Sequence, residues 1–194
     1  MISINQVLHG YANGHQMLAA SCEWTLDERK KIDTLSDLNG QCDEKEFKDY
    51  YTGYPIADGT QYVIAKTWYA AEMERPGCVW THSLILSIED ISHILSIADL
   101  LGLFVRPSSY QFSSYDKLLQ LEMGELEITN QINKKVLEYY IYTVYGLSRP
   151  RLVYFEADGQ ENIEELMICL RCMPIEMLRN FSFCTMAYGV RTYG

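Results

Sequence analysis

The stretch that decides the fold runs from Cys78 to Ser87 and reads CVWTHSLILS. Successive side chains of a β-strand point to opposite faces of a sheet. The stretch therefore separates into two sets, with Val79, Thr81, Ser83 and Ile85 on one face and Trp80, His82, Leu84 and Leu86 on the other. We predict a strand over 78–87, with His82 pointing into the packed side of the sheet.

Two hairpins are predicted around this strand. Residues 61–70 are rich in β-forming side chains and are joined to 78–87 by a loop over 72–77, which predicts a long hairpin. At the start of the chain, residues 2–8 alternate between apolar and polar side chains, and 16–24 form a returning strand. The intervening Ala12, Asn13 and Gly14 supply turn chemistry.

Helical and irregular segments complete the predicted architecture. Thr25, with Glu28 three residues later, is a capping box that opens a helix over 26–38, and Ser87 with Asp90 predicts another over 87–101. Further helices are expected over 132–145, after Asp158, and as a short turn from Pro174; strands are expected over 118–123, 151–155 and 181–187, and an irregular aromatic segment over 47–57. The fold class is α+β: antiparallel hairpins forming a mixed sheet packed against several amphipathic helices.

Length and composition exclude several classes of protein. The chain has 194 residues, which predicts a single α+β domain over 1–194, and we expect it to be the N-terminal fragment of a longer multi-domain protein. Its formal net charge of −10 disfavours nucleic-acid binding and docking on anionic membranes. The first residues lack signal-peptide features, and no apolar run is long enough to span a bilayer. We expect a cytoplasmic protein whose six cysteines are reduced.

Nucleotide-binding and cofactor motifs are missing from the sequence. It contains neither a GxxxxGK[ST] loop nor a GxGxxG that follows a strand. Any GTP or ATP chemistry therefore belongs to a partner, and no cofactor is expected.

Three of the four histidines lie in the two hairpins, and they are the strongest candidates for a polar site. His9, His15 and His82 could converge as an acid-base or metal cluster, but the chain has no HExxH motif. Hydrogen bonds that fix the hairpin ends are the favoured interpretation. The lone CxxC formed by Cys169 and Cys172 lies in an amphipathic helix, so no metal site and no catalytic residue is assigned.

Several sequence blocks together resemble a known family. They are residues 6–11 (QVLHGY), 14–15 (GH), 35–38 (LSDL), 53–55 (GYP), 67–70 (TWYA), 75–82 (RPGCVWTH), 106–107 (RP) and 181–185 (FSFCT). With these blocks the chain resembles, over nearly its whole length, the amino-terminal domain of the bacterial GTPase-associated protein family. Met186 follows the last block where a small turn residue is expected.

The resemblance implies a scaffold or adaptor module of a bacterial conflict, or antiviral-defence, system. Its implied partners are a GTPase encoded nearby and the rest of its own chain; a homodimer is left open. We predict a non-enzymatic interaction site at the hairpin ends, lined by His9, Tyr11, His15, Arg75, Trp80 and His82. The alternative is a hydrolase with a His/Cys or metal-bound His site, which requires the three histidines to meet in one cleft.

Overall fold

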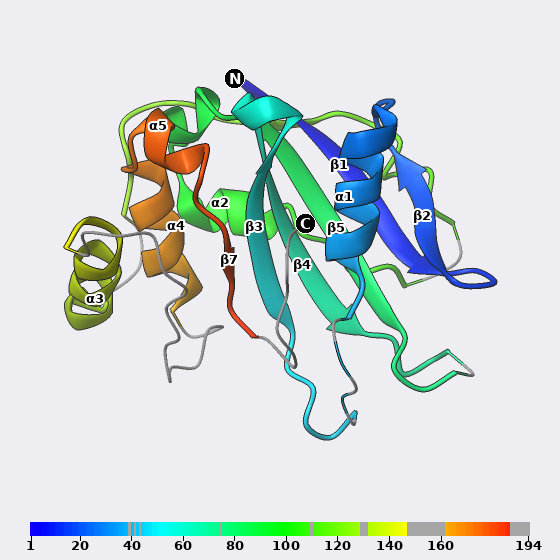
Figure 1. Ribbon diagram of the computed structural model, residues 1–194. Coiled ribbons are helices and arrows are strands. Elements are labelled where there is room, and N and C mark those ends of the chain that lie inside the picture. The colour runs from blue at the N-terminus through cyan, green and yellow to red at the C-terminus, as the bar shows by residue number, and fades with distance from the viewer. Residues whose placement is uncertain are drawn as a thin grey trace.

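One antiparallel sheet forms the centre of the molecule in the computed structural model. The structure describes residues 1–38, 40, 42, 44–73, 75–108, 111–128, 132–146 and 162–186. Within these residues seven strands form the sheet, in the order β2-β1-β5-β4-β3-β7, with β6 added beside β1 (Figure 1). All pairs between these strands are antiparallel. The α+β class is confirmed.

The second predicted hairpin forms the middle of this sheet. Strands β4 (Gln61–Tyr69) and β5 (Val79–Ser87) pair along their whole length, from Gln61 opposite Ser87 to Tyr69 opposite Val79. Every residue of β5 except the last is buried. Because β5 has β1 on its other side, both its faces and both its edges are covered, which explains its near-continuous burial.

The first predicted hairpin extends the sheet. β1 (Ile2–Tyr11) pairs with β2 (His15–Ala20), and the register shifts between Leu8 and His9, so that β2 carries one extra residue there. Asn13 and Gly14 supply the positive φ angles of the turn. The start of β1 pairs instead with β6 (Leu119–Leu121), which lies within the strand predicted over 118–123.

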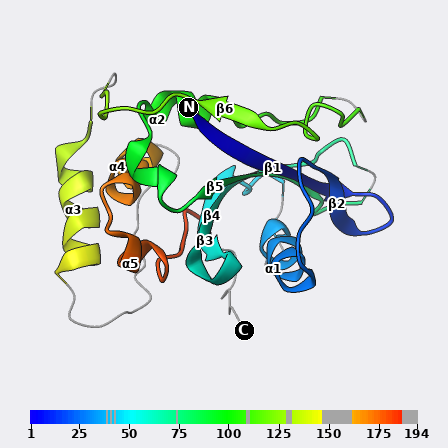
Figure 2. The same ribbon diagram turned by 90° about the horizontal axis from the view of Figure 1, so that it is seen from above.

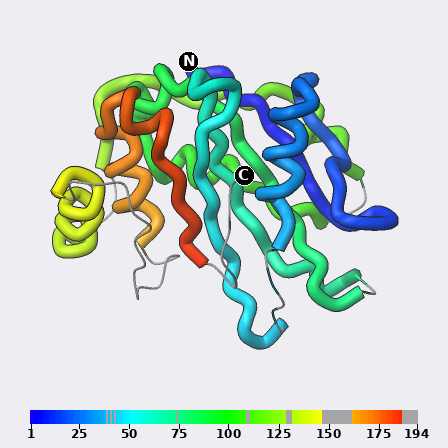
Figure 3. The backbone as a smooth tube through the Cα atoms, in the orientation of Figure 1, coloured from blue at the N-terminus to red at the C-terminus, as the bar shows by residue number. Residues whose placement is uncertain are grey.

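The segment over 47–57 is more regular than predicted. Residues Tyr50–Ile56 form strand β3, which pairs with β4 at every position. Pro55 is tolerated because β7 (Phe183–Cys184) covers only Thr52 and Gly53 on the outer edge, so no neighbour needs an N–H from the proline. The tube view shows β7 running beside β3 although the two lie far apart in the chain (Figure 3). Gly53 is required there, since a Cβ would overlap the Phe183 ring.

Helix α1 (Leu26–Ser36) covers one face of the sheet. Thr25 and Glu28 form the predicted capping box. Ile32 and Leu35 pack into a core with Val7, Val63, Ala65 and Ile85, which are the inward-facing residues of three strands. Seen from above, α1 lies alone on its side of the sheet (Figure 2). The helix ends at Ser36, two residues before the predicted end.

Several helices cover part of the opposite face: α2 (Ile97–Gly102), α4 (Ile163–Arg171) and α5 (Ile175–Leu178), with α3 (Lys134–Tyr145) outside α4 (Figure 2). Leu84 and Leu86 meet this layer, and Ile163, Leu166, Met167 and Leu170 of α4 are buried in it. The two short 3₁₀ turns of the described chain are η1 (Ala57–Gly59) and η2 (Asp90–His93).

The prediction of one helix over 87–101 was wrong. Residues 90–93 form only the short 3₁₀ turn η2. The backbone is extended at Ile94, which forms an isolated β-bridge with Met123, and helix α2 begins at Ile97. Ser96, rather than Ser87, provides the N-cap, because its side chain accepts the N–H of Asp99. The predicted N-cap, Ser87, therefore lies nine residues before the observed N-cap, Ser96.

Some predictions fall outside the described residues. The strand over 151–155 and the helix start at Asp158 belong to this group, and α4 begins at Ile163. Across the described chain, no helix combines the length and apolar character that a bilayer crossing needs.

Candidate functional site

Two of the predicted histidines come together at the end of the first hairpin, on the face that α1 covers. His9 has no exposed surface, and its ring stacks on that of His15 with centroids 5.7 Å apart and an interplanar angle of 13°. Tyr11 lies opposite His15 in the β1–β2 register, and its side chain packs against the cluster that contains Trp80 and Cys78.

The last turn of α1 supplies hydrogen-bond partners to this histidine pair. His9 Nε2 lies 2.8 Å from Asp33 Oδ1, and His15 Nε2 lies 2.9 Å from Ser36 Oγ. His15 Nδ1 is 3.7 Å from a carboxylate oxygen of Asp37. The pair therefore fixes the C-terminal end of α1 over the hairpin.

Burial and neighbouring charges decide the protonation of these groups. Burial lowers the pKa of His15, and the positive form of His9 lowers it further, against the opposing effect of Asp37 and Asp33. The hydrogen bond from His9 lowers the pKa of Asp33. At neutral pH the cluster holds an ionised Asp33 beside a neutral His15.

The order Asp37, His15, Ser36 has the outline of a hydrolase relay, but its hydrogen bonds run the wrong way. Ser36 Oγ donates its single proton to the backbone oxygen of Asp33 at 2.8 Å. His15 Nε2 must then donate to Ser36 Oγ, and it cannot accept the proton that a serine nucleophile has to release. Ser36 is also 1% exposed, so substrate has no access to its hydroxyl.

Cys78 is not an activated thiol, and the described residues form no metal centre. Burial raises the pKa of Cys78, which keeps it a thiol at neutral pH, although Arg75 acts in the opposite direction. Among the described residues, no group of three or more His, Cys, Asp and Glu side chains could hold a metal ion.

His82 points to the opposite face of the sheet, as its position in the strand predicted. It is 1% exposed, lies 2.9 Å from Gln6 Oε1 through Nε2, and accepts the Val105 N–H at Nδ1. Phe104 and Tyr115 pack edge-on against its ring. The three histidines thus do not meet in one cleft.

Trp80 is also a packing residue in this structure. It is 2% exposed, and its Nε1 donates to Glu72 at 2.6 Å. Glu72 pairs with Arg106 at 2.7 Å, which ties the segment after α2 to the β4–β5 hairpin. Gly10 leaves the space that the indole ring fills, because a Cβ there would overlap the ring.

A groove of about 510 Å³ lies between the β1–β2 turn, the segment that follows α1 and the β4–β5 loop. This volume is within the range of ligand-binding clefts. Three predicted site residues, Tyr11, His15 and Arg75, line it. His9, Trp80 and His82 are buried and do not; the remaining lining residues are Asp37, Leu38, Gly40, Cys42, Pro76, Gly77 and Cys78.

The sequence did not predict that the segment after α1 forms one wall of the groove. Asp37 and Leu38 stand in the block over 35–38 that carried the resemblance, so a signal existed. No strand or helix periodicity, however, places the end of a helix beside two hairpin loops.

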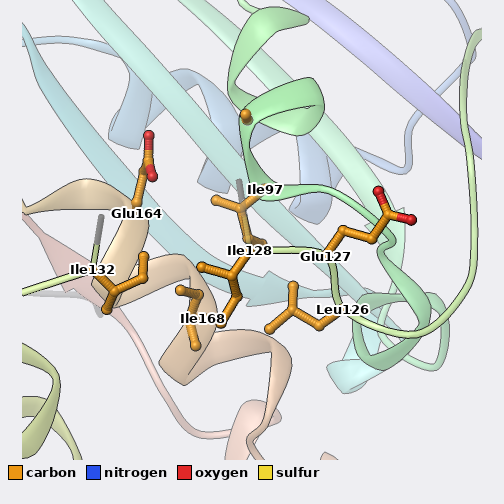
Figure 4. Close-up of a pocket in the computed structure, with 8 residues that line it drawn as sticks. Ile97, Leu126, Glu127, Ile128, Ile132, Glu164 and Ile168 are labelled. Carbon is orange, nitrogen blue, oxygen red and sulfur yellow. The ribbon is translucent and has the colours of Figure 1, made fainter. Parts of the chain in front are cut away.

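A second hollow lies between α2, α4 and the segment over 126–128. Figure 4 shows the apolar side chains of Ile97, Ile128 and Ile168 directed toward one another there. Its volume is about 10 Å³, which is the space of a single water molecule. It is a packing defect and cannot hold a substrate.

The described part of the chain thus has an α+β fold with a groove at one end of its sheet. The family model for GTPase-associated protein 1, N-terminal domain type 1, matches residues 3–104, just over half of the chain. The chain therefore belongs to this family. No curated protein and no solved structure matches it.

Proposed function

We propose that this chain is a non-enzymatic interaction module that binds a GTPase through the groove between the hairpin ends. The observation that carries the proposal is the convergence of Tyr11, His15 and Arg75 on that groove. Membership in the GTPase-associated family supports the choice of partner. We place the module in a bacterial GTPase-centred conflict system, where it would act as an adaptor.

The walls of the groove suit recognition of a protein surface. Arg75 is exposed on one wall and Asp37 is half exposed on another, while Leu38 and Pro76 add apolar surface between them. Arginine and tyrosine are the side chains that contribute most often to interface energies. The stacked histidines beneath hold the end of α1, which leads into one of these walls.

Catalysis is not favoured as the function of the same groove. Ser36, beneath the groove, is buried and donates its proton to a backbone oxygen, and burial raises the pKa of Cys78, which keeps it a thiol at neutral pH. The hydrolase alternative has no observation of its own to support it.

Calorimetry with the GTPase encoded beside this chain tests the proposal, with the GTPase loaded with GTP, loaded with GDP and free of nucleotide. Arg75→Glu should weaken binding at least tenfold, or about 1.4 kcal/mol. Lys30→Glu is the matched control, because it makes the same charge change on the exposed side of α1. Equal losses in both variants, or no binding by the folded wild-type chain in any nucleotide state, would overturn the proposal.

His82→Ala is a poor probe of this interface. Its imidazole is buried on the other face of the sheet, so its loss acts on folding. Tyr11→Ala is the better second variant, since Tyr11 lines the groove.

A further inference from the structure

Arg75 brings to the groove a positive charge that the described part of the molecule does not neutralise. It is the one permanent cation among the described residues that line the groove, and within those ranges it forms no ion pair. Burial raises the pKa of Cys78, and Arg75 lies close enough to this thiol to act against that rise. The guanidinium is therefore exposed beside the groove and available to a ligand.

Asp37, the negative group of the same groove, already has partners within the chain. Its Oδ1 accepts the Leu38 N–H at 2.8 Å and lies 3.7 Å from His15 Nδ1. A ligand that complements the groove therefore has to supply an acceptor for Arg75 rather than a donor for Asp37. A carboxylate matches the guanidinium best among protein side chains, because it accepts two parallel N–H groups.

We infer that the GTPase places one Asp or Glu carboxylate against Arg75, and that His15 takes up a proton when this complex forms. The inference rests on the proposed function, since it names the chemistry of the partner and the pH dependence of the same groove. The formal net charge of −10 would repel a run of acidic residues, so an isolated carboxylate is expected.

His15 is placed to respond to such a group. Its side chain lines the groove and is 13% exposed, while its Nε2 is held by Ser36 beneath. The charged and titratable groups around it are His9 on β1, Asp33 with its ion-pair partner Arg29 on α1, Asp37 after α1, and Tyr11, Arg75 and Cys78 in the groove.

The sign of the effect follows from these charges. Burial lowers the pKa of His15, Asp37 and Asp33 act against this, and His9 adds to it. A partner carboxylate adds a negative charge and neutralises Arg75, and both changes raise the pKa of His15. The complex then binds more protons than the free chain, so its affinity should be up to about tenfold higher at pH 6 than at pH 8. An uncharged group in the groove would only bury the ring further, and no proton would be taken up.

Calorimetry with the GTPase encoded beside this chain counts the protons, at about pH 6.5 in PIPES and in Bis-Tris, whose ionisation enthalpies differ. The wild-type complex should take up a fraction of a proton, and Arg75→Gln should both weaken binding and remove this uptake. His15→Gln keeps a donor for Ser36 but cannot titrate, so it should bind without that fraction. His93→Gln is the matched control, because His93 is an exposed histidine of η2, away from the groove, and uptake should be unchanged.

The outcomes separate this inference from the proposed function. Binding that depends on Arg75, with equal proton uptake by the wild type and His15→Gln, would overturn the inference and leave the proposed function standing. If the glutamine variant does not fold, NMR titration of His15 in the free and bound wild type replaces it, and an equal pKa in both would overturn the inference.

Absence of binding would overturn the proposed function, and the carboxylate site is then tested without the GTPase. The probe is sodium acetate against sodium chloride at equal ionic strength, with the pKa of His15 followed by NMR. A higher pKa in acetate that disappears in Arg75→Gln would support the site. An equal pKa in the two salts would overturn it.

Discussion

His82 should make the stability of the fold depend on pH between about 4 and 6.5. Burial lowers its pKa from 6.5 to about 4. The geometry agrees with a neutral ring, because Nδ1 accepts the Val105 N–H at 3.2 Å and leaves Nε2 to donate to Gln6. The Gln6 amide cannot adjust, since its Nε2 donates to the backbone oxygens of Ser114 and Lys117.

The sign of the effect follows from which state binds the proton. Above pH 6.5 the imidazole is neutral in both states and contributes no pH dependence. Below 6.5 the unfolded chain takes up a proton that the folded chain excludes, so stability falls until about pH 4 and then levels off. A pKa change of this size corresponds to about 3 kcal/mol, or a fall in melting temperature on the order of 10 °C for a chain of this length.

Urea unfolding of the wild type and His82→Gln, followed by tryptophan fluorescence from pH 7 to 4, measures this contribution. His82→Gln cannot titrate, so its stability disadvantage should shrink by about 3 kcal/mol as the pH falls. His15, whose pKa is also lowered, remains in both proteins and cancels in the difference. Parallel pH profiles would refute the argument. If the variant does not fold, an NMR titration of His82 in the wild type should still give a pKa near 4.

Three further outcomes are expected. Gly10→Ala should cost about 1–3 kcal/mol and shift tryptophan emission, because its Cβ overlaps the Trp80 ring; unchanged emission would contradict that contact. Thr81→Val should cost about 1–3 kcal/mol in urea unfolding, since the Thr81 hydroxyl donates to the buried backbone oxygen of Ser36 at 2.6 Å, and a neutral result would show that this carbonyl is satisfied otherwise. Cys78 should alkylate far more slowly than an exposed cysteine at neutral pH, as mass spectrometry of the labelled chain would show, because burial raises its pKa.

The sheet could be predicted from the sequence where period-two alternation was strong. The strand around His82 and both hairpins follow from it, and the capping box at Thr25 located α1. Strand β3 was not predicted, because its tyrosines, Gly53 and Pro55 obscure the alternating pattern of a strand. The proline is tolerated because it lies on the part of the outer edge that β7 does not cover.

The candidate site was predictable only in part. Alternation indicated correctly that His82 points inward, but it could not show that His9 and His15 lie on the other face with α1 between them and solvent. That separation depends on the β1–β5 register, in which His9 pairs with Thr81 and Leu8 with His82. Register between distant strands is a tertiary property, so local spacing does not contain it.

The pairing of β3 with β7 has a consequence for synthesis of the chain on the ribosome. Thr52 meets Cys184, 132 positions later, and β7 brings Phe183 onto Gly53. At a synthesis rate of about 5–20 residues per second, β7 is made roughly 7–26 s after β3. During that time its outer edge and the face that receives the late helices are open to other nascent chains. The segment over 3–104 that matches the family model is therefore synthesised well before the strand that covers the outer edge of β3.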